Sequence, residues 1–413
     1  MSAPCHSTLH VITMTHGSAT RVLIYSQDGF GLGHLRRNLN ICNQIKKRRA
    51  QASCLIIADS PVAPFFKLPS NCDFIKIPTI VKVDTGIWRP DRLPMSEREL
   101  LAIRSDIIRN VAVSFQPDVF LVDHMPHGAL GELAEPLQIL KQRSPHTKVV
   151  LGIRDILGVP EVIRRQWNNE GAFAAIEAFY DSVFIYGCAD LFDVINQYEF
   201  PSSLVGKARY CGYVCRENDV VSSPVFKKKI RRRDQQPDKF ILVTGGGGAD
   251  ASFFMDQFID AARLLRADLP FHAFVTTGPF MNKDQRKLLR RKTKNLPIVV
   301  SRLGEDSVHI LRSADLVISM AGYNTISEIL HFRKNAIVVP RAGPSAEQSM
   351  RSRLMSERGL FGTIHPTRLT PQNLAELIWK KLKKKPRLDE AMIPDLSGAS
   401  RAASFILNGN GEA

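Results

Sequence analysis

Residues 239–251 read KFILVTGGGGADA and join an apolar run of strand type, four consecutive glycines and the start of a helical pattern. A strand, a glycine loop and a helix in this order are typical of a Rossmann-like unit, whose helix start directs free backbone N–H groups at a ligand. The same order appears near the amino terminus, where the apolar run Val22–Tyr25 precedes a glycine loop at 28–34 and a helical stretch at about 35–48. We therefore expect an α/β protein with two Rossmann-like domains.

Both halves alternate short apolar runs with longer helical patterns, which is typical of parallel sheets covered by helices. A polar, basic and turn-rich segment separates the two halves and predicts a linker. The expected organisation is a tail at 1–20, a first domain at 21–217, a linker at 218–238, a second domain at 239–390 and a tail at 391–413 that packs back on the first domain. Further strands are expected at 54–58, 73–77, 119–123, 149–153, 183–186, 208–211, 273–276, 298–300, 316–319 and 336–339.

Composition excludes some classes of protein. The 413 residues are 44% hydrophobic and 23% charged, as in ordinary globular proteins of two domains. The chain contains no apolar run long enough to span a membrane, and residues 1–20 lack the pattern of a signal peptide, so we expect a cytoplasmic protein.

The net charge of +16 invites an anionic partner. Its basic residues are widely spread without an aromatic-interleaved stripe, so we expect no nucleic-acid partner. The densest basic run, Lys227–Arg233, is interpreted as a solvated linker, with contact to an anionic membrane as the alternative.

The seven cysteines are scattered and form no C-x-x-C motif, so their spacing predicts neither a zinc site nor a disulfide framework. Several of them adjoin strand-like runs, which favours packing of reduced thiols in the core of a cytosolic protein. They are Cys5, Cys42, Cys54, Cys72, Cys188, Cys211 and Cys215.

The first glycine loop carries Gly31 and Gly33 and ends in His34. It does not complete the G-x-G-x-x-G motif of dinucleotide-binding proteins, because residue 34 is histidine. An imidazole at the mouth of a cleft could remove a proton from a hydroxyl group near neutral pH. The alternative is a histidine that only hydrogen-bonds the backbone at the start of the helix.

The second glycine loop contains Thr244, Gly245, Gly246 and Gly247 at a strand-to-helix junction, which suits an anionic phosphate. It lacks the Gly-Lys-Ser/Thr ending of a P-loop, so ATP hydrolysis of that type is not expected. A simple tight turn is the alternative reading.

Two further loops follow strands of the second half. In the first, Gly322 opens the turn, Asn324 and Thr325 are residues of helix-cap type, and Glu328 is expected near the first turn of the helix. The carboxylate of Glu328 could accept hydrogen bonds from two ribose hydroxyls, although a capping role would explain it equally well.

The second of these loops ends in Glu347 and Gln348, whose planar polar groups suit sugar hydroxyls. An ordinary polar helix start is the alternative. In the first half, Asp123 with His124 and Arg154 with Asp155 follow strands at the edge where α/β sites form, and turn structure is the alternative for both pairs.

The order of these pieces resembles glycosyltransferase family 28, from about 21 to 382 and more specifically over 304–359. The most specific match is Ser319-x-x-Gly322-x-x-Thr325-x-x-Glu328, followed by Val339-Pro340 and then by Glu347-Gln348. The resemblance implies the GT-B fold, in which two Rossmann-like domains face each other across a cleft, with an acceptor domain first and a nucleotide-sugar donor domain second. It also implies a UDP-sugar as donor and a lipid-linked or polysaccharide-precursor acceptor.

The resemblance assigns roles position by position. The loop with Gly31, Gly33 and His34 corresponds to the loop that faces the acceptor phosphate and ends in a candidate base. Thr244 to Gly248 border the donor diphosphate, and Arg216 lies near the phosphates at the domain junction. Leu303 meets the uracil ring, Glu328 binds ribose and Gln348 holds the donor sugar.

Two departures separate the chain from the family's peptidoglycan-precursor enzyme. That enzyme pairs two glutamines where this chain has Glu347-Gln348, which favours a donor sugar other than N-acetylglucosamine. The acceptor segment is replaced by Gly152–Asp155, so Arg154 and Asp155 are expected to meet a different acceptor.

We expect an inverting transfer in which His34, or alternatively Asp123 or His124, deprotonates the acceptor. No D-x-D motif occurs in the chain, so we expect activity without a metal or another cofactor. The alternatives are a nucleotide-sugar hydrolase, because Gly31–Arg37 is similar to a loop of that class, an epimerase acting on the same donors, and a non-catalytic nucleotide-sugar-binding subunit. A membrane patch at 81–83 and 87–89, with peripheral attachment to the inner face, is a secondary hypothesis.

Overall fold

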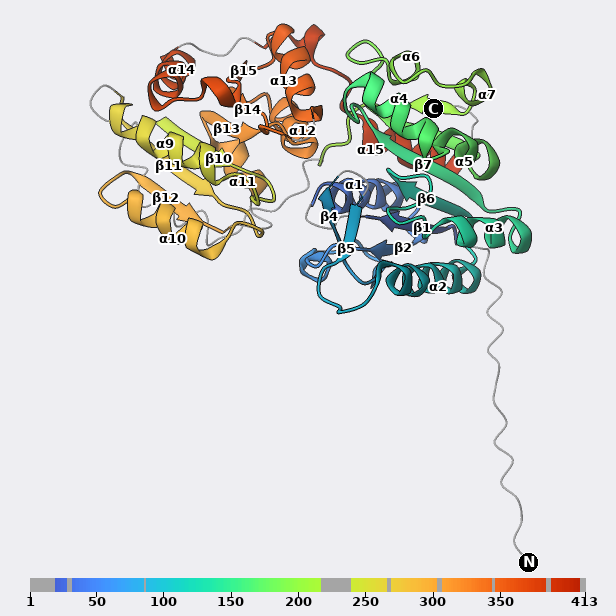
Figure 1. Cartoon of the computed structure of the whole chain (residues 1–413). Helices are drawn as coiled ribbons and strands as arrows, with labels where there is room; N and C mark the ends of the chain where they lie inside the picture. The colour runs from blue at the N-terminus through green and yellow to red at the C-terminus, as the bar shows by residue number, and fades with distance from the viewer. Residues whose placement is uncertain are drawn as a thin grey trace, which may run out of the picture.

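The computed structural model describes residues 19–27, 32–84, 87–216, 239–265, 269–302, 307–343, 346–383 and 388–408. Its two domains each contain one parallel sheet with helices on both faces (Figure 1). The first sheet has the strand order β3-β2-β1-β6-β7-β8-β9, and the second has the order β12-β11-β10-β13-β14-β15. The expected pair of Rossmann-like domains is therefore confirmed. The linker expected at 218–238 and most of the tail expected at 1–20 lie outside the described residues.

The amino-terminal domain alternates strands and helices along the chain. Its central strands are buried along their whole length, as expected for a sheet covered on both faces. The elements are β1 (Arg21–Ser26), α1 (Gly33–Arg48), β2 (Ser53–Ala58), η1 (Ala63–Phe65), β3 (Cys72–Lys76), β4 (Ile80–Asp84), β5 (Ile87–Pro90), α2 (Glu97–Phe115), β6 (Val119–Asp123), α3 (Ala134–Arg143), β7 (Lys148–Arg154), α4 (Pro160–Asn169), α5 (Ala172–Phe179), β8 (Ser182–Tyr186), α6 (Val194–Gln197), α7 (Ser202–Val205) and β9 (Ala208–Tyr210).

The carboxyl-terminal domain repeats this plan around its own core. Its elements are β10 (Lys239–Thr244), α9 (Ser252–Leu265), β11 (Phe271–Thr276), α10 (Lys283–Lys292), β12 (Ile298–Ser301), α11 (Ser307–Ser313), β13 (Leu316–Met320), α12 (Tyr323–His331), β14 (Ala336–Val339), α13 (Glu347–Glu357), β15 (Gly362–Thr363), η2 (Pro366–Arg368), α14 (Pro371–Lys383) and η3 (Glu390–Met392).

The last helix, α15 (Gly398–Asn408), lies in the amino-terminal domain beside α1 (Figure 1). Ala399, Ala402 and Ala403 are buried in a hydrophobic cluster that also holds Ile41 of α1. The Arg48 guanidinium donates to Ser400 Oγ at 2.6 Å at the far end of α1. The chain thus crosses between the domains twice, which ties them together.

Every strand that the sequence predicts is present, and no end differs by more than two residues. The sequence patterns missed the β4–β5 hairpin and the two-residue strand β15. The hairpin was missed because its residues were interpreted as a membrane patch. No described helix has the length and apolar character needed to cross a membrane.

The sheet order positions the ligand-binding edge of each domain. In the first domain β1 lies between β2 and β6, and in the second β10 lies between β11 and β13, so the chain reverses direction across the sheet at each of these strands. Loops that leave the carboxyl ends of strands at such a reversal form a crevice for ligands. The two glycine loops leave β1 and β10 at these points, and α12 faces the start of α1 across the gap (Figure 1).

The cysteines are not all scattered in space. Sulfur atoms of Cys42, Cys54 and Cys72 all lie within 4.8 Å of one another, although the residues belong to α1, β2 and β3. All three are free thiols and two are buried, as expected from the sequence, but their grouping in space was not predicted. Spacing along the sequence could not reveal the group, because each thiol comes from a different element.

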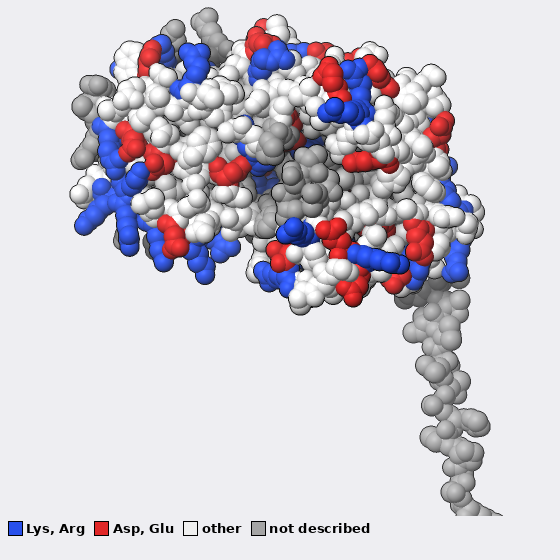
Figure 2. Space-filling view, viewed as in Figure 1, with Lys and Arg blue, Asp and Glu red and all other residues white. Residues whose placement is uncertain are grey.

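Basic and acidic side chains are interspersed over most of the face that Figure 2 shows, and basic ones gather at the outer side of the carboxyl-terminal domain. Helix α10 contributes Arg290, Arg291 and Lys292 in its last turn alone. The positive charge is thus distributed over the surface.

Candidate active site between the two domains

A cavity of about 260 Å³ lies between the two domains and collects most of the residues that the sequence singled out. The amino-terminal domain supplies the start of α1 and the end of β7, and the other domain supplies three strand-to-helix loops. Its lining residues are Leu32, Gly33, His34, Arg36, Arg37, Arg154, Gly245, Gly246, Gly247, Gly248, Ala249, Asp250, Met320, Gly322, Tyr323, Asn324, Thr325, Arg341, Glu347 and Gln348. Gly31 and Leu303 lie outside the described residues.

The glycine loop after β10 packs tightly against the loop after β11. Gly248 has a φ of +88°, and a Cβ atom at this position would lie 1.8 Å from the carbonyl oxygen of Thr277. A Cβ at Gly245 would lie 2.2 Å from the Cβ of Ala251, which directly precedes α9. Glycine is therefore required here by close packing as well as by backbone conformation. Because the glycines have no side chains, the backbone of the loop itself lines the cavity.

Gly248→Ala is expected to lower the free energy of unfolding of the carboxyl-terminal domain by about 2–4 kcal/mol, because positive φ and a backbone clash both oppose a side chain. Chemical denaturation measures the loss. Gly206→Ala is the control, since a Cβ there meets nothing within 4 Å and its φ is −65°. Its effect is expected within about 0.5 kcal/mol. Equal stability of the two variants would contradict this account of the loop.

His34 lies in the first turn of α1, where Asp123 from the end of β6 meets it. His34 Nδ1 is 3.1 Å from Asp123 Oδ2, and the His34 side chain is 15% exposed on the cavity side. The buried Arg37 donates to both oxygens of Asp123 at 2.6 and 2.8 Å, and Asn38 donates at 3.1 Å. The His34 ring is thereby held between the cavity and a buried carboxylate.

Charge compensation keeps this carboxylate ionised. Burial alone would raise the pKa of Asp123, but Arg37 and His34 outweigh it and lower the pKa below its usual range. Asp123 is fully buried and is not open to an acceptor, so the prediction that Asp123 is itself a base is replaced by a role in orienting His34.

His124, the third candidate base, lies behind His34 with ring centroids 5.3 Å apart. Burial, and after it the charge of Arg154, lower its pKa well below the ordinary value and keep the imidazole neutral. Its φ of +90° is a strained conformation for a residue with a side chain. Within the described residues, its Nδ1 is buried without a hydrogen-bond partner. The arrangement favours His34 as the residue that meets the cavity.

The structure gives the pair Arg154 and Asp155 roles that the sequence did not predict. Arg154 Nη1 forms an ion pair with Glu347 Oε2 at 2.8 Å, which joins a predicted acceptor residue to a predicted donor residue. Asp155 is 1% exposed and accepts two hydrogen bonds from Arg351, at 2.7 and 2.8 Å, and one from Tyr213 at 2.7 Å. We therefore reassign Asp155 from acceptor binding to the joining of the two domains.

Tyr323 at the start of α12 inserts between the domains. Its hydroxyl donates to the carbonyl oxygen of Tyr186 at 3.0 Å and accepts from the backbone N–H of Val214 at 2.8 Å. The Arg37 guanidinium lies 5.5 Å from the centre of its ring, and Arg351 lies 5.6 Å from it. Two buried ion pairs, one within the first domain and one that joins the two domains, thus meet on one aromatic ring.

Sequence reasoning missed Arg37, Arg351 and Tyr323. Arg37 carried a usable signal, because a residue three positions after His34 on the predicted helix lies on the same face. Arg351 and Tyr323 carried none, because their partners are far away in the sequence.

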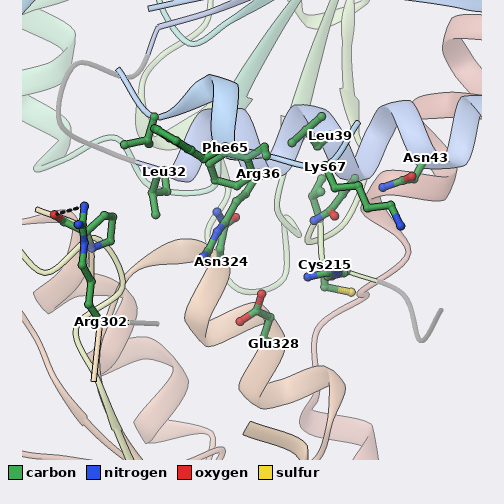
Figure 3. Close-up of a pocket in the computed structure, with 16 residues that line it drawn as sticks. Leu32, Arg36, Leu39, Asn43, Phe65, Lys67, Cys215, Arg302, Asn324 and Glu328 are labelled. Carbon is green, nitrogen blue, oxygen red and sulfur yellow. Dashed lines mark hydrogen bonds between the residues drawn. The ribbon is translucent and has the colours of Figure 1, made fainter. Parts of the chain in front are cut away.

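A second cavity of about 480 Å³ opens beside the first and contains Glu328. Glu328 extends from α12 toward α1, where Arg36 and Leu39 face it (Figure 3). Arg216, Arg302 and Lys67 also line this cavity, while Phe65 and Phe66 supply an aromatic rim. Arg36 and Asn324 line both cavities, which makes them neighbouring parts of one cleft.

Glu328 is a buried carboxylate that faces a cavity lined by cations. Burial raises its pKa, against the opposing charges of Arg36 and Arg216. It lies in the second turn of α12, not near the first turn as the sequence predicted, because the helix begins at Tyr323 with Gly322 as its N-cap. A capping role for Glu328 is therefore wrong.

Asn324 and Thr325 are not caps either, since both lie inside the helix. The Asn324 side chain instead donates to the carbonyl oxygen of Gly33 across the cleft at 3.0 Å. Gln348 is buried, and its side-chain oxygen accepts from the backbone N–H of Arg341 at 3.1 Å. Asp250 at the end of the glycine loop forms an ion pair with Arg341. These contacts order the loops that line the cavity.

Comparison with known proteins agrees with the geometry. Residues 240–405 match the glycosyltransferase family 28 C-terminal domain. The UDP-N-acetylglucosamine–N-acetylmuramyl-(pentapeptide) pyrophosphoryl-undecaprenol N-acetylglucosamine transferase of Bacteroides fragilis is 23% identical over 82% of this chain and 80% of its own length. The protein of the same name from Acinetobacter baylyi is 25% identical over 46% of this chain, which spans about half, 49%, of that relative.

A solved structure extends the likeness to both domains. The MurG protein of Acinetobacter baumannii superposes with a TM-score of 0.53 at 15% identity, covering 93% of this chain and 95% of that one. Two Rossmann-like domains with a shared cleft define the GT-B fold. Residues 240–405 match the C-terminal domain of the family 28 transferases, and MurG-type transferases are among the proteins that the chain resembles.

Proposed function

We propose that the protein transfers a sugar from a UDP-sugar to a hydroxyl group of an acceptor, with inversion at the anomeric carbon. The observation that carries the proposal is the position of Glu328, a buried carboxylate in a cavity of about 480 Å³ beside the glycine loop. A carboxylate pointing into such a space can accept hydrogen bonds from both hydroxyls of a ribose. The N–H groups of the glycine loop and the cations around it suit the diphosphate.

Arg36 is the cation that we add to the donor site. It belongs to α1 of the first domain, yet it lines both cavities and opposes the charge of Glu328 in the second domain. With Arg216 at the domain junction, it would neutralise the diphosphate that leaves in the transfer. This supports the expectation of metal-independent activity, which rests on the absence of a D-x-D motif.

His34 is the proposed general base. The proposal requires the His34 tautomer in which Nδ1 donates to Asp123 at 3.1 Å and does not accept from Arg37 Nη2, which lies 2.9 Å from it, so that Nε2 can accept the proton of the acceptor hydroxyl. The acceptor oxygen attacks the anomeric carbon, the bond from that carbon to the diphosphate oxygen breaks, and UDP leaves with the electron pair. Because Asp123 stays ionised beside Arg37, it stabilises the imidazolium that forms.

The donor sugar is proposed to differ from N-acetylglucosamine. Where a glutamine amide would offer both a donor and an acceptor, Glu347 offers only acceptors and forms an ion pair with Arg154. The sugar would therefore meet a charged pair on this side of the cavity. A lipid-linked or glycan acceptor, a cytoplasmic location and peripheral contact with an anionic membrane remain part of the proposal. The β4–β5 hairpin, with the half-buried Trp88, is the segment proposed for that contact.

Thermal shift against UDP-, GDP-, ADP- and dTDP-sugars, in buffer with EDTA, tests the donor site. UDP-sugars are expected to raise the Tm of the wild type, and Glu328→Gln is expected to weaken their binding about 10–100-fold, because hydrogen bonds to a charged group are lost. Without ligand, Glu328→Gln is expected to keep or raise the Tm, since it removes a buried charge. Glu376→Gln, on an exposed face of α14, is the control.

Three results would contradict the proposal: stabilisation by none of the UDP-sugars, equal stabilisation of wild type and Glu328→Gln, or stabilisation only in the presence of a divalent metal. Product analysis then separates transfer from its alternative. Release of free sugar and UDP at the same rate without any acceptor would assign the site to a hydrolase, in which His34 activates water.

A further inference from the structure

A group of three cysteines lies away from the cleft, in the core layer between α1 and the first sheet. Cys42 belongs to α1, Cys54 to β2 and Cys72 to the edge strand β3. Cys54 and Cys72 are register partners on neighbouring parallel strands, so their side chains lie on the same face of the sheet. Helix α1 covers that face and places Cys42 over them, with all three sulfurs within 4.8 Å of one another. None of the three forms a disulfide.

We propose that Cys42, Cys54 and Cys72 form a structural site for a thiophilic divalent ion of the zinc class. Zinc binds thiolate sulfur at about 2.3 Å, which places the sulfurs of a tetrahedral site about 3.8 Å apart. The observed separations exceed this value by at most about 1 Å, a difference that side-chain rotation can remove. Cysteine sulfur selects zinc over magnesium or calcium, which prefer oxygen.

The surroundings fit a three-thiolate site with one open position. Cys42 and Cys54 are buried, whereas Cys72 is half-buried and gives the ion a path from solvent. Water would occupy the fourth position on this side. Binding releases the proton of each protonated thiol to the buffer and transfers no electrons, so it needs neither oxidant nor reductant.

Lys46 supplies the compensating charge. It lies one turn after Cys42 on α1, and its ammonium acts electrostatically on both Cys54 and Cys72. Its Nζ is held by the carbonyl oxygens of Ala50 and Ala52 at the turn into β2. A dication with three thiolates has a net charge of −1, which one lysine neutralises; a monovalent ion such as Cu⁺ would leave −1 in a largely buried place. The charge balance therefore favours the divalent ion.

The site would fasten α1 to the two strands at the edge of the sheet. The same helix carries His34, Arg36 and Arg37 at its start, and Leu39, one turn before Cys42, lines the cavity of Glu328. The ion would act as a clamp that keeps this helix in place, at a distance from the chemistry. Such a role is independent of any metal requirement in the transfer itself.

Metal content and thermal stability of the full-length chain test the site. Protein purified in a non-thiol reductant is expected to hold about one Zn²⁺ per chain by mass spectrometry, and Co²⁺ is expected to give thiolate-to-metal charge-transfer absorption. Adding Zn²⁺ to the metal-free protein at a thousandfold excess over Kd is expected to raise the Tm by about 8–16 °C. Cys72→Ser is expected to lose the ion, the absorption and the stabilisation. Cys188→Ser, a half-buried cysteine of the same domain, is the control and is expected to keep all three.

A second measurement uses the wild type alone, in case Cys72→Ser does not fold. Zn²⁺ is expected to slow alkylation of Cys72 by iodoacetamide at least about tenfold, with no effect on Cys188, as followed by peptide mass spectrometry. The proposal is overturned if the wild type binds no Zn²⁺, if Cys72→Ser keeps it, or if the purified protein shows a disulfide between Cys54 and Cys72 in place of metal.

Discussion

Arg351→Met is expected to lower the free energy of unfolding by about 3–5 kcal/mol, because it leaves a buried carboxylate without its cation. Arg351 is fully buried and joins α13 of the second domain to Asp155 of the first through two hydrogen bonds of 2.7 and 2.8 Å. Methionine can occupy the space of the side chain, but it cannot neutralise Asp155, which would retain uncharged donors such as the Tyr213 hydroxyl and the backbone N–H of Ile156. This loss of stability is expected to weaken the association of the two domains.

Urea unfolding of each variant measures the effect. Arg353→Met on the same helix is the matched control, since Arg353 forms an ion pair with Glu357 at side-chain exposures of 63% and 58%. An exposed pair of this kind contributes at most about 1 kcal/mol. The double variant Asp155→Asn with Arg351→Met is expected to recover part of the loss, because no charge remains buried. Equal losses of unfolding free energy for Arg351→Met and Arg353→Met would contradict the role of Arg351 in joining the two domains.

The stability that Arg351 contributes through Asp155 is expected to depend on pH. Burial alone would raise the pKa of Asp155, but Arg351 outweighs it and lowers the pKa in the folded state. A group with a lowered folded pKa contributes stability above its unfolded pKa, about 4, and the contribution is lost as the pH falls toward the folded value. The difference in stability between wild type and Arg351→Met should therefore narrow below about pH 4.

His34→Ala is expected to lower kcat/KM about 10²–10⁴-fold, which is the usual contribution of a general base. The substitution leaves the ion pair of Arg37 with Asp123 in place, so the fold of the site should survive. UDP release from the donor that stabilises the wild type is the rate to measure. The thermal shift produced by that donor should remain near the wild-type value, because His34 acts on the acceptor.

The exposed His146→Ala is the control for His34→Ala and is expected to keep wild-type rates. Asp123→Asn is expected to slow turnover as well, since an amide cannot stabilise the imidazolium. It should also destabilise the protein, because Arg37 would lose its buried counter-charge. A His34→Ala variant with full activity would contradict the role of His34 as general base and would favour His124 instead.

The fold could be predicted from the sequence because its signals are local. Apolar runs such as Phe240–Val243, each followed by a glycine loop and a helical pattern, occur in both halves and agree with the observed strands and helices. The glycine loops and Glu328 were found in the same way. Even the error about capping by Asn324 and Thr325 was one of a single helical turn, since the strand and the helix around them were placed correctly.

The amino-acid sequence alone thus determined the two-domain α/β architecture, the loops that face the cleft and the acidic residue proposed for the donor. Only the tertiary structure decided that Asp155 pairs with Arg351, 196 positions away, that Arg37 and Asp123 hold His34, and that Cys42, Cys54 and Cys72 meet. The reason is physical. Strand and helix periodicities are set by neighbouring residues, whereas a buried ion pair or a thiol cluster depends on distant segments that come together only when the domains fold and pack.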